Sequence, residues 1–135
     1  MDSQTRSKMI ISGIQSDKSS FTASLLRAVL VSYLGSSVPS SYSSIPIFDF
    51  ICYYRGKSVL KDKYSSMFCA ELKQMDSILS TAISKEKSLI LVESYAISTT
   101  PQDSIIHLRS VIEILFEVNA YVIISSNNIL HSILV

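Results

Sequence analysis

Apolar residues along this chain alternate between two patterns: short continuous runs, and longer stretches in which they recur every three or four positions. Each run is bounded by polar or turn-forming residues. Runs of this kind are typical of strands that are covered on both faces of a parallel sheet. We therefore expect strands over KMIIS (8–12), IPIFDFICYY (45–54), SLILVES (88–94) and AYVIISS (120–126).

The stretches with three-to-four spacing predict helices between these strands. The first ends at Gly35, and glycine is favoured directly after a helix. The third begins at Thr100-Pro101-Gln102-Asp103, which combines an N-cap threonine with a proline at the first position and an acid at the third. A last helix is expected over NILHSILV (128–135). The expected apolar stripes are Phe21, Leu25, Leu26, Val29, Leu30, Tyr33 and Leu34 in the first helix, Met67, Phe68, Leu72, Met75, Ile78, Leu79 and Ala82 in the second, and Ile105, Ile106, Leu108, Val111, Ile112, Leu115 and Phe116 in the third.

This alternation predicts an α/β fold in which a mainly parallel sheet is flanked by helices. We expect residues 1–8 to be an N-terminal tail and residues 9–135 to form one domain that is incomplete at its C-terminal end. The stretch 47–54 stays open between a parallel strand and an antiparallel flank. The residues expected on central strands are Ile10, Ile11, Leu89, Ile90, Leu91, Val122, Ile123 and Ile124.

Composition argues against several classes of function. A chain of 135 residues, 47% of them apolar, fits one domain with a single core. Its net charge is +1, and its Lys and Arg residues are scattered rather than gathered into a basic patch that would bind nucleic acid. No apolar run reaches the roughly 18 residues needed to span a membrane. Cys52 and Cys69 lack the paired spacing of a metal site.

The stretch IISGIQSDKSSF (10–21) carries the candidate chemistry. An apolar run reaches Gly13, a polar loop follows, and Lys18-Ser19 opens a helix. This is close to the pattern G-x-x-x-x-G-K-[ST], in which backbone N–H groups hold phosphates, the lysine reaches the β/γ oxygens and the hydroxyl holds magnesium. The match is incomplete, because Gly13 is one residue too close to Lys18 and Asp17 replaces the second glycine.

Ligands of such folds bind beyond the carboxyl ends of the parallel strands. Three loops of this chain meet that condition: Gly13 to Ser19, Glu93 to Thr100, and Ser125 to Asn128. Any site is therefore expected where these loops come together.

Five segments, in this order, resemble the ATPase domain of the MutS family, and together they cover Met9 to about Leu134. MIISGIQSDKSSF stands at the P-loop as a degenerate Walker A motif, and YLGSSVPSSYSSI resembles the end of a helix and the GSYVPA turn. SSMFCAEL resembles the STFMxEM signature segment. SLILVESYAISTTPQDS resembles SLVLxDExGRGTSTxDG, and AYVIISSNN resembles the strand that leads to ATH. PSSYSS and Asn127 are more similar to the eukaryotic meiotic branch.

The resemblance implies a P-loop NTPase fold of the ABC/MutS type, ATP and Mg²⁺ as cofactors, and a function in DNA mismatch repair or meiotic recombination. It implies a partner of the same kind, another MutS-type subunit in a homo- or heterodimer. Mismatched DNA would be contacted only through family domains that are absent from this chain. No membrane association and a nuclear location are implied as well.

Carried over residue by residue, the resemblance assigns Lys18 to the phosphates, and Ser19 and Glu93 to the metal ion. Gly13, Ser19, Ser20 and Ser66 complete the implied ATP site. Ser66 stands at the signature serine that reaches the γ-phosphate of a partner subunit.

The same comparison implies that the site is eroded. Asp17 adds a charge that costs roughly 3 kcal/mol at about 5 Å from a phosphate charge with an effective dielectric near 20. Ser94 replaces the Glu that would orient water, and a hydroxyl has neither the charge nor the basicity for that role. Asn127 stands at the switch histidine. No residue is therefore expected to be catalytic, ATP binding is expected to be weak or absent, and hydrolysis absent.

Simpler interpretations stay open for each residue. Lys18, Ser19 and Ser20 suit any helix start, Glu93 suits a solvated strand end, and Ser66 suits an N-cap. Three classes of function therefore remain: a DNA-dependent ATPase subunit that still binds ATP, a pseudo-ATPase kept as a dimerisation or interaction module, and a truncated product without an independent role.

Overall fold

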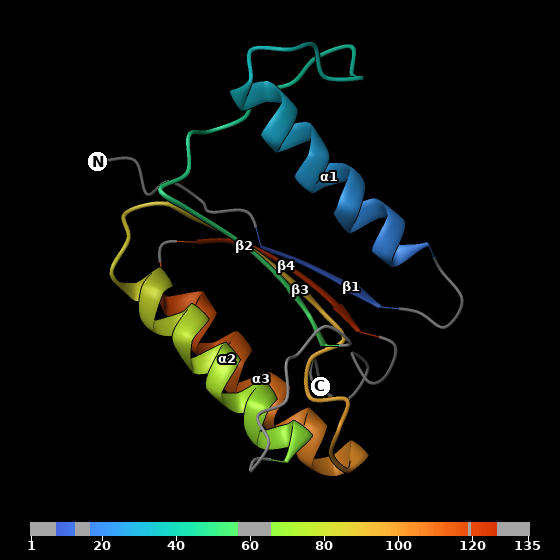
Figure 1. Cartoon of the computed structure of the whole chain (residues 1–135), viewed down its shortest axis with the longest axis vertical. Coiled ribbons are helices and arrows are strands. Elements are labelled where there is room, and N and C mark those ends of the chain that lie inside the picture. The colour runs from blue at the N-terminus through green and yellow to red at the C-terminus, as the bar shows by residue number, and fades with distance from the viewer. Residues whose placement is uncertain (1–7, 13–16, 57–65, 119, 127–135) are drawn as a thin grey trace.

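The computed structural model describes residues 8–12, 17–56, 66–118 and 120–126. Strands and helices alternate along these ranges, so the predicted α/β fold is confirmed (Figure 1). The expected last helix over 128–135 lies outside the described residues. In chain order the elements are β1 (Lys8–Ser12), α1 (Lys18–Tyr33), β2 (Phe50–Arg55), α2 (Met67–Ile83), β3 (Ser88–Glu93), α3 (Pro101–Glu117) and β4 (Ala120–Ser126).

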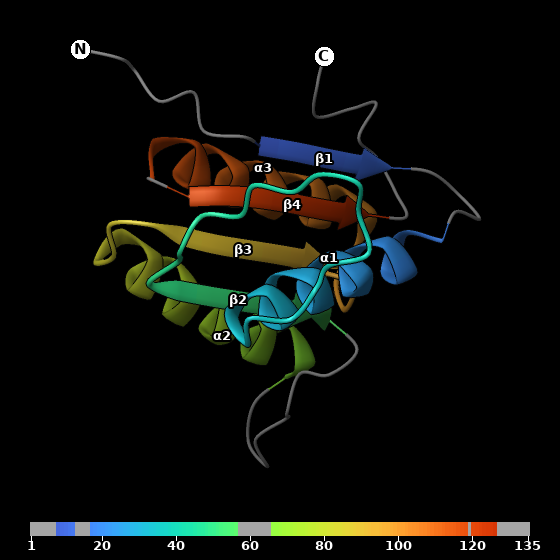
Figure 2. The same ribbon diagram turned by 90° about the horizontal axis from the view of Figure 1, so that it is seen from above.

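The strands of the described ranges form one parallel sheet in the order β1-β4-β3-β2 (Figure 2). β3 and β4 are central, as predicted. The prediction that β1, with Ile10 and Ile11, is also central is wrong for this sheet, because β3 and β4 both lie between β1 and β2 and leave β1 at an edge. The antiparallel alternative for 47–54 is wrong too, since β2 runs parallel to β3.

β2 starts later than the apolar run suggested, at Phe50 instead of Ile45. Pro46 has no backbone N–H to donate to a ladder, which disfavours a strand there. Asp49 fixes the actual start through two hydrogen bonds with Lys87. The backbone N–H of Asp49 donates to Lys87 O at 2.8 Å, and the Lys87 N–H donates to Asp49 Oδ2 at 3.0 Å. The same contacts set the register of β2 against β3.

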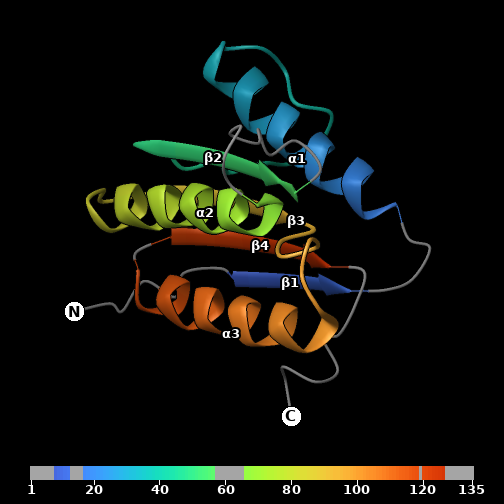
Figure 3. The same cartoon turned by 60° about the horizontal axis from the view of Figure 1, so that its bottom comes forward.

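The helices cover the two faces of the sheet unequally: α1 lies on one face, and α2 and α3 lie on the other (Figures 1 and 3). Alternate residues of a strand point to opposite faces. Ile90 and Val92 of β3 therefore belong to the larger core with α2 and α3, and Leu89 and Leu91 belong to the smaller core under α1. The two cores explain why β3 is buried along its whole length.

The predicted apolar stripe of α1 is mostly not buried in the described structure, and Val29 is its one member in the buried class. Phe21, Leu30 and Tyr33 are each more than two-fifths exposed, and Leu34 is 84% exposed. Apolar residues occur around the whole helix, but only one side of it faces the sheet. The predictions for α2 and α3 hold better, although Met67, Ile106 and Phe116 are exposed as well. No helix within the described ranges is long and apolar enough to cross a membrane.

The predicted starts of α2 and α3 are confirmed by their capping contacts. The hydroxyl of Thr100 accepts a hydrogen bond from the Asp103 N–H at 3.2 Å and donates to Asp103 Oδ2 at 2.8 Å. At the start of α2, the Ser66 hydroxyl accepts from the Cys69 N–H at 3.1 Å. Both serve donors that the first turn of a helix leaves without an intrahelical partner.

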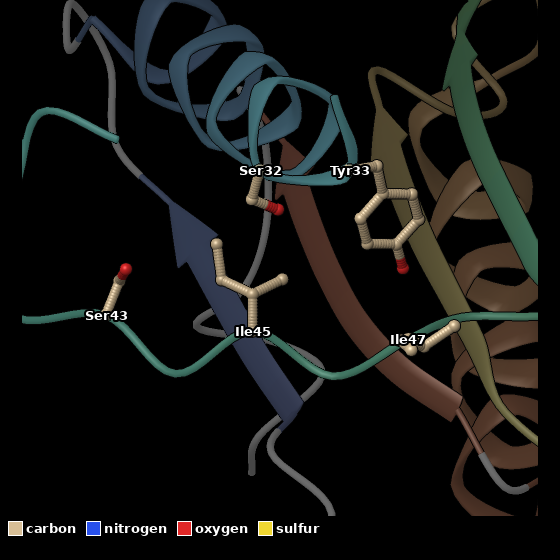
Figure 4. Close-up of a pocket in the computed structure, with 5 residues that line it drawn as sticks. All are labelled: Ser32, Tyr33, Ser43, Ile45 and Ile47. Carbon is tan, nitrogen blue, oxygen red and sulfur yellow. The ribbon is translucent and has the colours of Figure 1, made fainter. Parts of the chain in front are cut away.

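Tyr33 at the end of α1 holds the segment that returns to β2. Its hydroxyl donates to Pro46 O at 3.1 Å and accepts from the Phe48 N–H at 2.6 Å. A pocket of about 520 Å³ lies beside this connection, lined by Ser32, Tyr33, Ser43, Ile45 and Ile47 (Figure 4). No residue implied in the ATP site lines it, so the chemistry expected from the sequence lies elsewhere.

Candidate functional site

The first turn of α1 meets the carboxyl ends of β3 and β4, where the sequence predicted a site. The Ser19 hydroxyl donates a hydrogen bond to Glu93 Oε1, across 74 positions of sequence. The Lys18 ammonium donates to the backbone oxygen of Ser126, with 3.3 Å between Nζ and O. The structure thus brings Lys18, Ser19 and Glu93 together from distant parts of the chain.

Lys18 is buried, with 6% of its surface exposed, although it is the first residue of α1. A lysine is rarely so buried without partners, because its charge loses hydration. The next turn anchors it, since the buried Thr22 hydroxyl donates to Lys18 O at 3.0 Å. The helix N-terminus and the ammonium therefore place positive charge at the same point of the sheet edge.

Glu93 is 5% exposed, and donors from two other elements surround its carboxylate. Ser19 donates to Oε1, and the Tyr53 hydroxyl donates to Oε2 at 2.5 Å. Arg55 Nε lies 3.7 Å from Oε2, and the Arg55 side chain is half-exposed. Burial, reinforced by the hydrogen bond to Glu93, raises the pKa of Tyr53. The protein itself thus supplies the carboxylate with two hydrogen-bond donors and a counter-ion.

The loop after β3 begins in an unusual conformation. Ser94 has φ 55° and Ala96 has φ 56°, a left-handed region that favours glycine. The Ser94 N–H donates to Ser125 O at 3.0 Å, which ties the loop to β4. Gly56 lies so close that a Cβ there would be 2.1 Å from Ser94 O. Ala96 therefore adopts a conformation that glycine would adopt at less cost.

A buried carboxylate supports the same loop from α2. Glu71 is fully buried and accepts hydrogen bonds from the Ser98 hydroxyl, from the Ser98 N–H at 3.4 Å and from the Tyr54 hydroxyl at 3.5 Å. Burial raises the pKa of Tyr54 above its usual range and that of Tyr95 to about 12, and the Glu71 charge adds to both. Glu71 therefore joins α2, β2 and the loop in one polar cluster.

The other residues implied in the site have simpler roles or lie outside the described part. Ser20 is exposed and makes no hydrogen bond through its side chain within the described ranges. Ser66 caps α2 and has no hydrogen bond to Lys18, Ser19 or Glu93 in the described structure. Gly13 and Asn127 lie outside the described residues. Ser94 follows Glu93 directly and offers a hydroxyl where the resemblance implies a carboxylate.

Sequence reasoning missed Tyr53, Arg55 and Glu71. Tyr53 and Arg55 could be found only by placing β2 beside β3, where Arg55 is opposite Glu93. Glu71 gave an earlier signal, since its spacing to Met75 puts a charged residue on the buried side of α2. Among the described residues, no group of three or more His, Cys, Asp or Glu is placed to hold a metal ion.

Comparison with known proteins places this chain in a family. The MutS domain V family matches residues 9–130, which is most of the chain. The chain belongs to the MutS family. As a MutS domain V, it is 34% identical to the DNA mismatch repair protein MSH3 of Yarrowia lipolytica over 103 residues. It is 28% identical to the DNA mismatch repair protein MutS of Streptococcus gordonii over 113 residues.

These two alignments cover 76% and 84% of this MutS domain V, but only 10% and 13% of the respective relatives. The chain therefore spans about a tenth of the length of the relatives it matches. What those relatives do as whole proteins passes to this chain only as a proposal.

Proposed function

We propose that this MutS domain V is a nucleotide-binding module of DNA mismatch repair or meiotic recombination, with a P-loop NTPase fold, that holds ATP weakly and does not hydrolyse it. The observation that carries the proposal is the meeting of Lys18, Ser19 and Glu93 at the carboxyl edge of a parallel sheet. Parallel α/β sheets bind ligands at this edge. The relatives named as DNA mismatch repair proteins support the biological setting.

The residues present fit a phosphate group. Lys18 supplies a buried positive charge at the N-terminus of a 16-residue helix. The first turn of such a helix adds N–H groups and a partial positive charge, which favour anions. Lys18 would therefore contact a phosphate oxygen while Ser126 O keeps its ammonium in place. Asp17 is exposed, so solvent screens its repulsion well below the value expected from sequence.

The residues present do not fit the magnesium ion that the family resemblance implies. Oε1 of Glu93 already accepts from Ser19, and Oε2 accepts from Tyr53 beside the Arg55 guanidinium. A divalent cation would have to displace these donors and approach a positive charge. We therefore assign no step to a metal ion in this chain.

Hydrolysis lacks a group to orient the attacking water. Ser94 follows Glu93, its backbone N–H is committed to Ser125 O, and its hydroxyl is a poor base near neutral pH. Glu93 already accepts hydrogen bonds from Ser19 and Tyr53 and is ion-paired with Arg55. ATP bound at Lys18 would therefore remain intact.

A second function, a pseudo-ATPase that serves as an interaction module for another MutS-type subunit, is favoured by the exposed apolar side of α1. Leu30 and Leu34 lie there in the exposed class, and Tyr42 and Ile47 of the following segment are about four-fifths exposed. Large exposed apolar side chains of this kind are available for contact with a partner. Sedimentation of the chain over a range of concentrations distinguishes this function, since a clean monomer throughout would contradict it.

The binding proposal is tested by titrating the chain with a fluorescent ATP analogue. We expect a dissociation constant in the high micromolar range, roughly 5 to 6 kcal/mol of binding free energy. Lys18→Ala should abolish binding, because it removes the buried charge. Lys73→Ala, at an exposed position of α2, is the matched control and should bind as the unmodified chain does. Equal binding by the Lys18→Ala and unmodified chains would overturn the proposal.

A further inference from the structure

Arg55 and Glu93 are held together by the sheet itself. They are the last residues of β2 and β3, and the parallel register places them directly opposite each other. Arg55 Nε lies 3.7 Å from Glu93 Oε2. Because strand pairing fixes both backbones, the contact does not depend on a flexible loop.

Arg55 gives Glu93 the compensating positive charge that a metal ion would otherwise supply. A carboxylate that is 5% exposed needs a compensating charge, and guanidinium supplies one that persists at every physiological pH. Ser19 donates one hydrogen bond to Oε1, and Tyr53 donates one to Oε2. The Arg55 side chain also stays half-exposed to solvent.

We propose that Arg55 takes the place of a divalent cation beside Glu93, so that a phosphate-bearing ligand binds at Lys18 without magnesium. The inference has two halves. The metal half, that Arg55 keeps a divalent cation away from Glu93, does not depend on the proposed function. The ligand half, that a phosphate-bearing ligand binds at Lys18 without magnesium, rests on the proposed function. The Arg55 guanidinium then lies beside the carboxylate, and its repulsion excludes a doubly charged cation.

The metal half is tested with Mn²⁺ alone, whose free-ion EPR signal falls when the ion binds. The unmodified chain should leave the signal unchanged, and Arg55→Gln should reduce it, because Glu93 loses its cation. Arg55→Lys keeps the charge and should behave as the unmodified chain. Arg109→Gln is the matched control, since Arg109 is ion-paired only with Glu113 on the exposed side of α3 within the described structure. Manganese binding by the unmodified chain, or none by Arg55→Gln, would overturn the inference.

The ligand half is tested by titrating the fluorescent ATP analogue in EDTA and again in magnesium. For the unmodified chain the two affinities should agree within about twofold, whereas Arg55→Gln should bind at least about tenfold more tightly with magnesium. A tenfold gain from magnesium in the unmodified chain would contradict the inference. If the analogue fails to bind under both conditions, the proposed function is wrong, and the manganese measurement alone decides whether Arg55 excludes the metal.

Discussion

The hydroxyl of Ser19, in the first turn of α1, donates a hydrogen bond to the carboxylate of Glu93 at the end of β3. Both residues were implied as magnesium ligands, and in this structure they bind each other. The contact fastens the start of α1 to the sheet edge. Its contribution can be measured apart from any ligand.

Ser19→Ala should lower the free energy of unfolding by about 1 to 2 kcal/mol, because a hydrogen bond to a charged group is lost at a buried carboxylate. Ser20→Ala changes the same residue type at the next position, which is also exposed but makes no side-chain hydrogen bond within the described ranges, and should stay within about 0.5 kcal/mol of the unmodified chain. Urea unfolding of the two variants gives the comparison. Equal stabilities would show that the contact is not formed in solution.

Glu71 should contribute more to the free energy of unfolding than Ser19 does, since three donors converge on its fully buried carboxylate. Glu71→Ala leaves those donors unsatisfied and opens a cavity, so we expect a loss of about 3 kcal/mol or more. Glu71→Gln keeps an acceptor oxygen and should lose less. Hydrogen exchange at the Ser98 amide should accelerate in both variants before the rest of the chain responds.

Glu113→Gln is the control for Glu71→Gln, because Glu113 is exposed and paired only with Arg109 in the described structure. Its stability should lie within about 0.5 kcal/mol of the unmodified chain. Unchanged Ser98 exchange in Glu71→Ala would contradict the role of Glu71 in holding the loop.

Substitutions at Gly56 and Gly35 distinguish the cost of a steric clash from the cost of backbone strain. Gly56→Ala would put a Cβ 2.1 Å from the backbone oxygen of Ser94, which cannot move without breaking the loop's bond to Ser125. We expect the free energy of unfolding to fall by several kcal/mol. Gly35→Ala meets no atom within 4 Å and carries only the strain of φ 73°, about 1 kcal/mol. If thermal unfolding shows similar losses of stability in Gly56→Ala and Gly35→Ala, the close contact between Gly56 and Ser94 is contradicted.

Alkaline pH should destabilise the fold through Tyr95. Burial raises its pKa from the ordinary value of 10.0 to about 12 in the folded chain. The folded state therefore holds the proton more tightly, so stability is complete below pH 10 and is lost as the pH rises toward 12. In Tyr95→Phe, the decrease in the free energy of unfolding at pH 11 should be smaller by about 1 kcal/mol. Tyr42→Phe, at an exposed position, should leave the pH profile of urea unfolding unchanged.

Strand β3 and the starts of α2 and α3 were predictable because their signals are local. The apolar run of β3 and the Thr100 and Ser66 caps each depend on a few neighbouring residues. The burial of α1 was not predictable in this way, since three-to-four spacing does not say how many sides of a helix are covered. Leu34 fits the stripe and is 84% exposed.

The candidate site was predictable in part. The rule that ligands bind at the carboxyl ends of parallel strands placed Lys18, Ser19 and Glu93 together. Arg55 escaped prediction because its contact with Glu93 depends on β2 and β3 being neighbours, which is a property of the strand order. The sequence could therefore suggest a metal site, and only the register shows an arginine at that place.

The most direct test of the account is phosphate release from saturating ATP by the unmodified chain and by Lys18→Ala. The account holds that Lys18 binds a phosphate and that Ser94 cannot orient water. Both proteins should therefore release phosphate at the background rate, while the fluorescent analogue binds only the unmodified chain. Turnover by the unmodified chain that disappears in Lys18→Ala would contradict the account and make this MutS domain V a working ATPase.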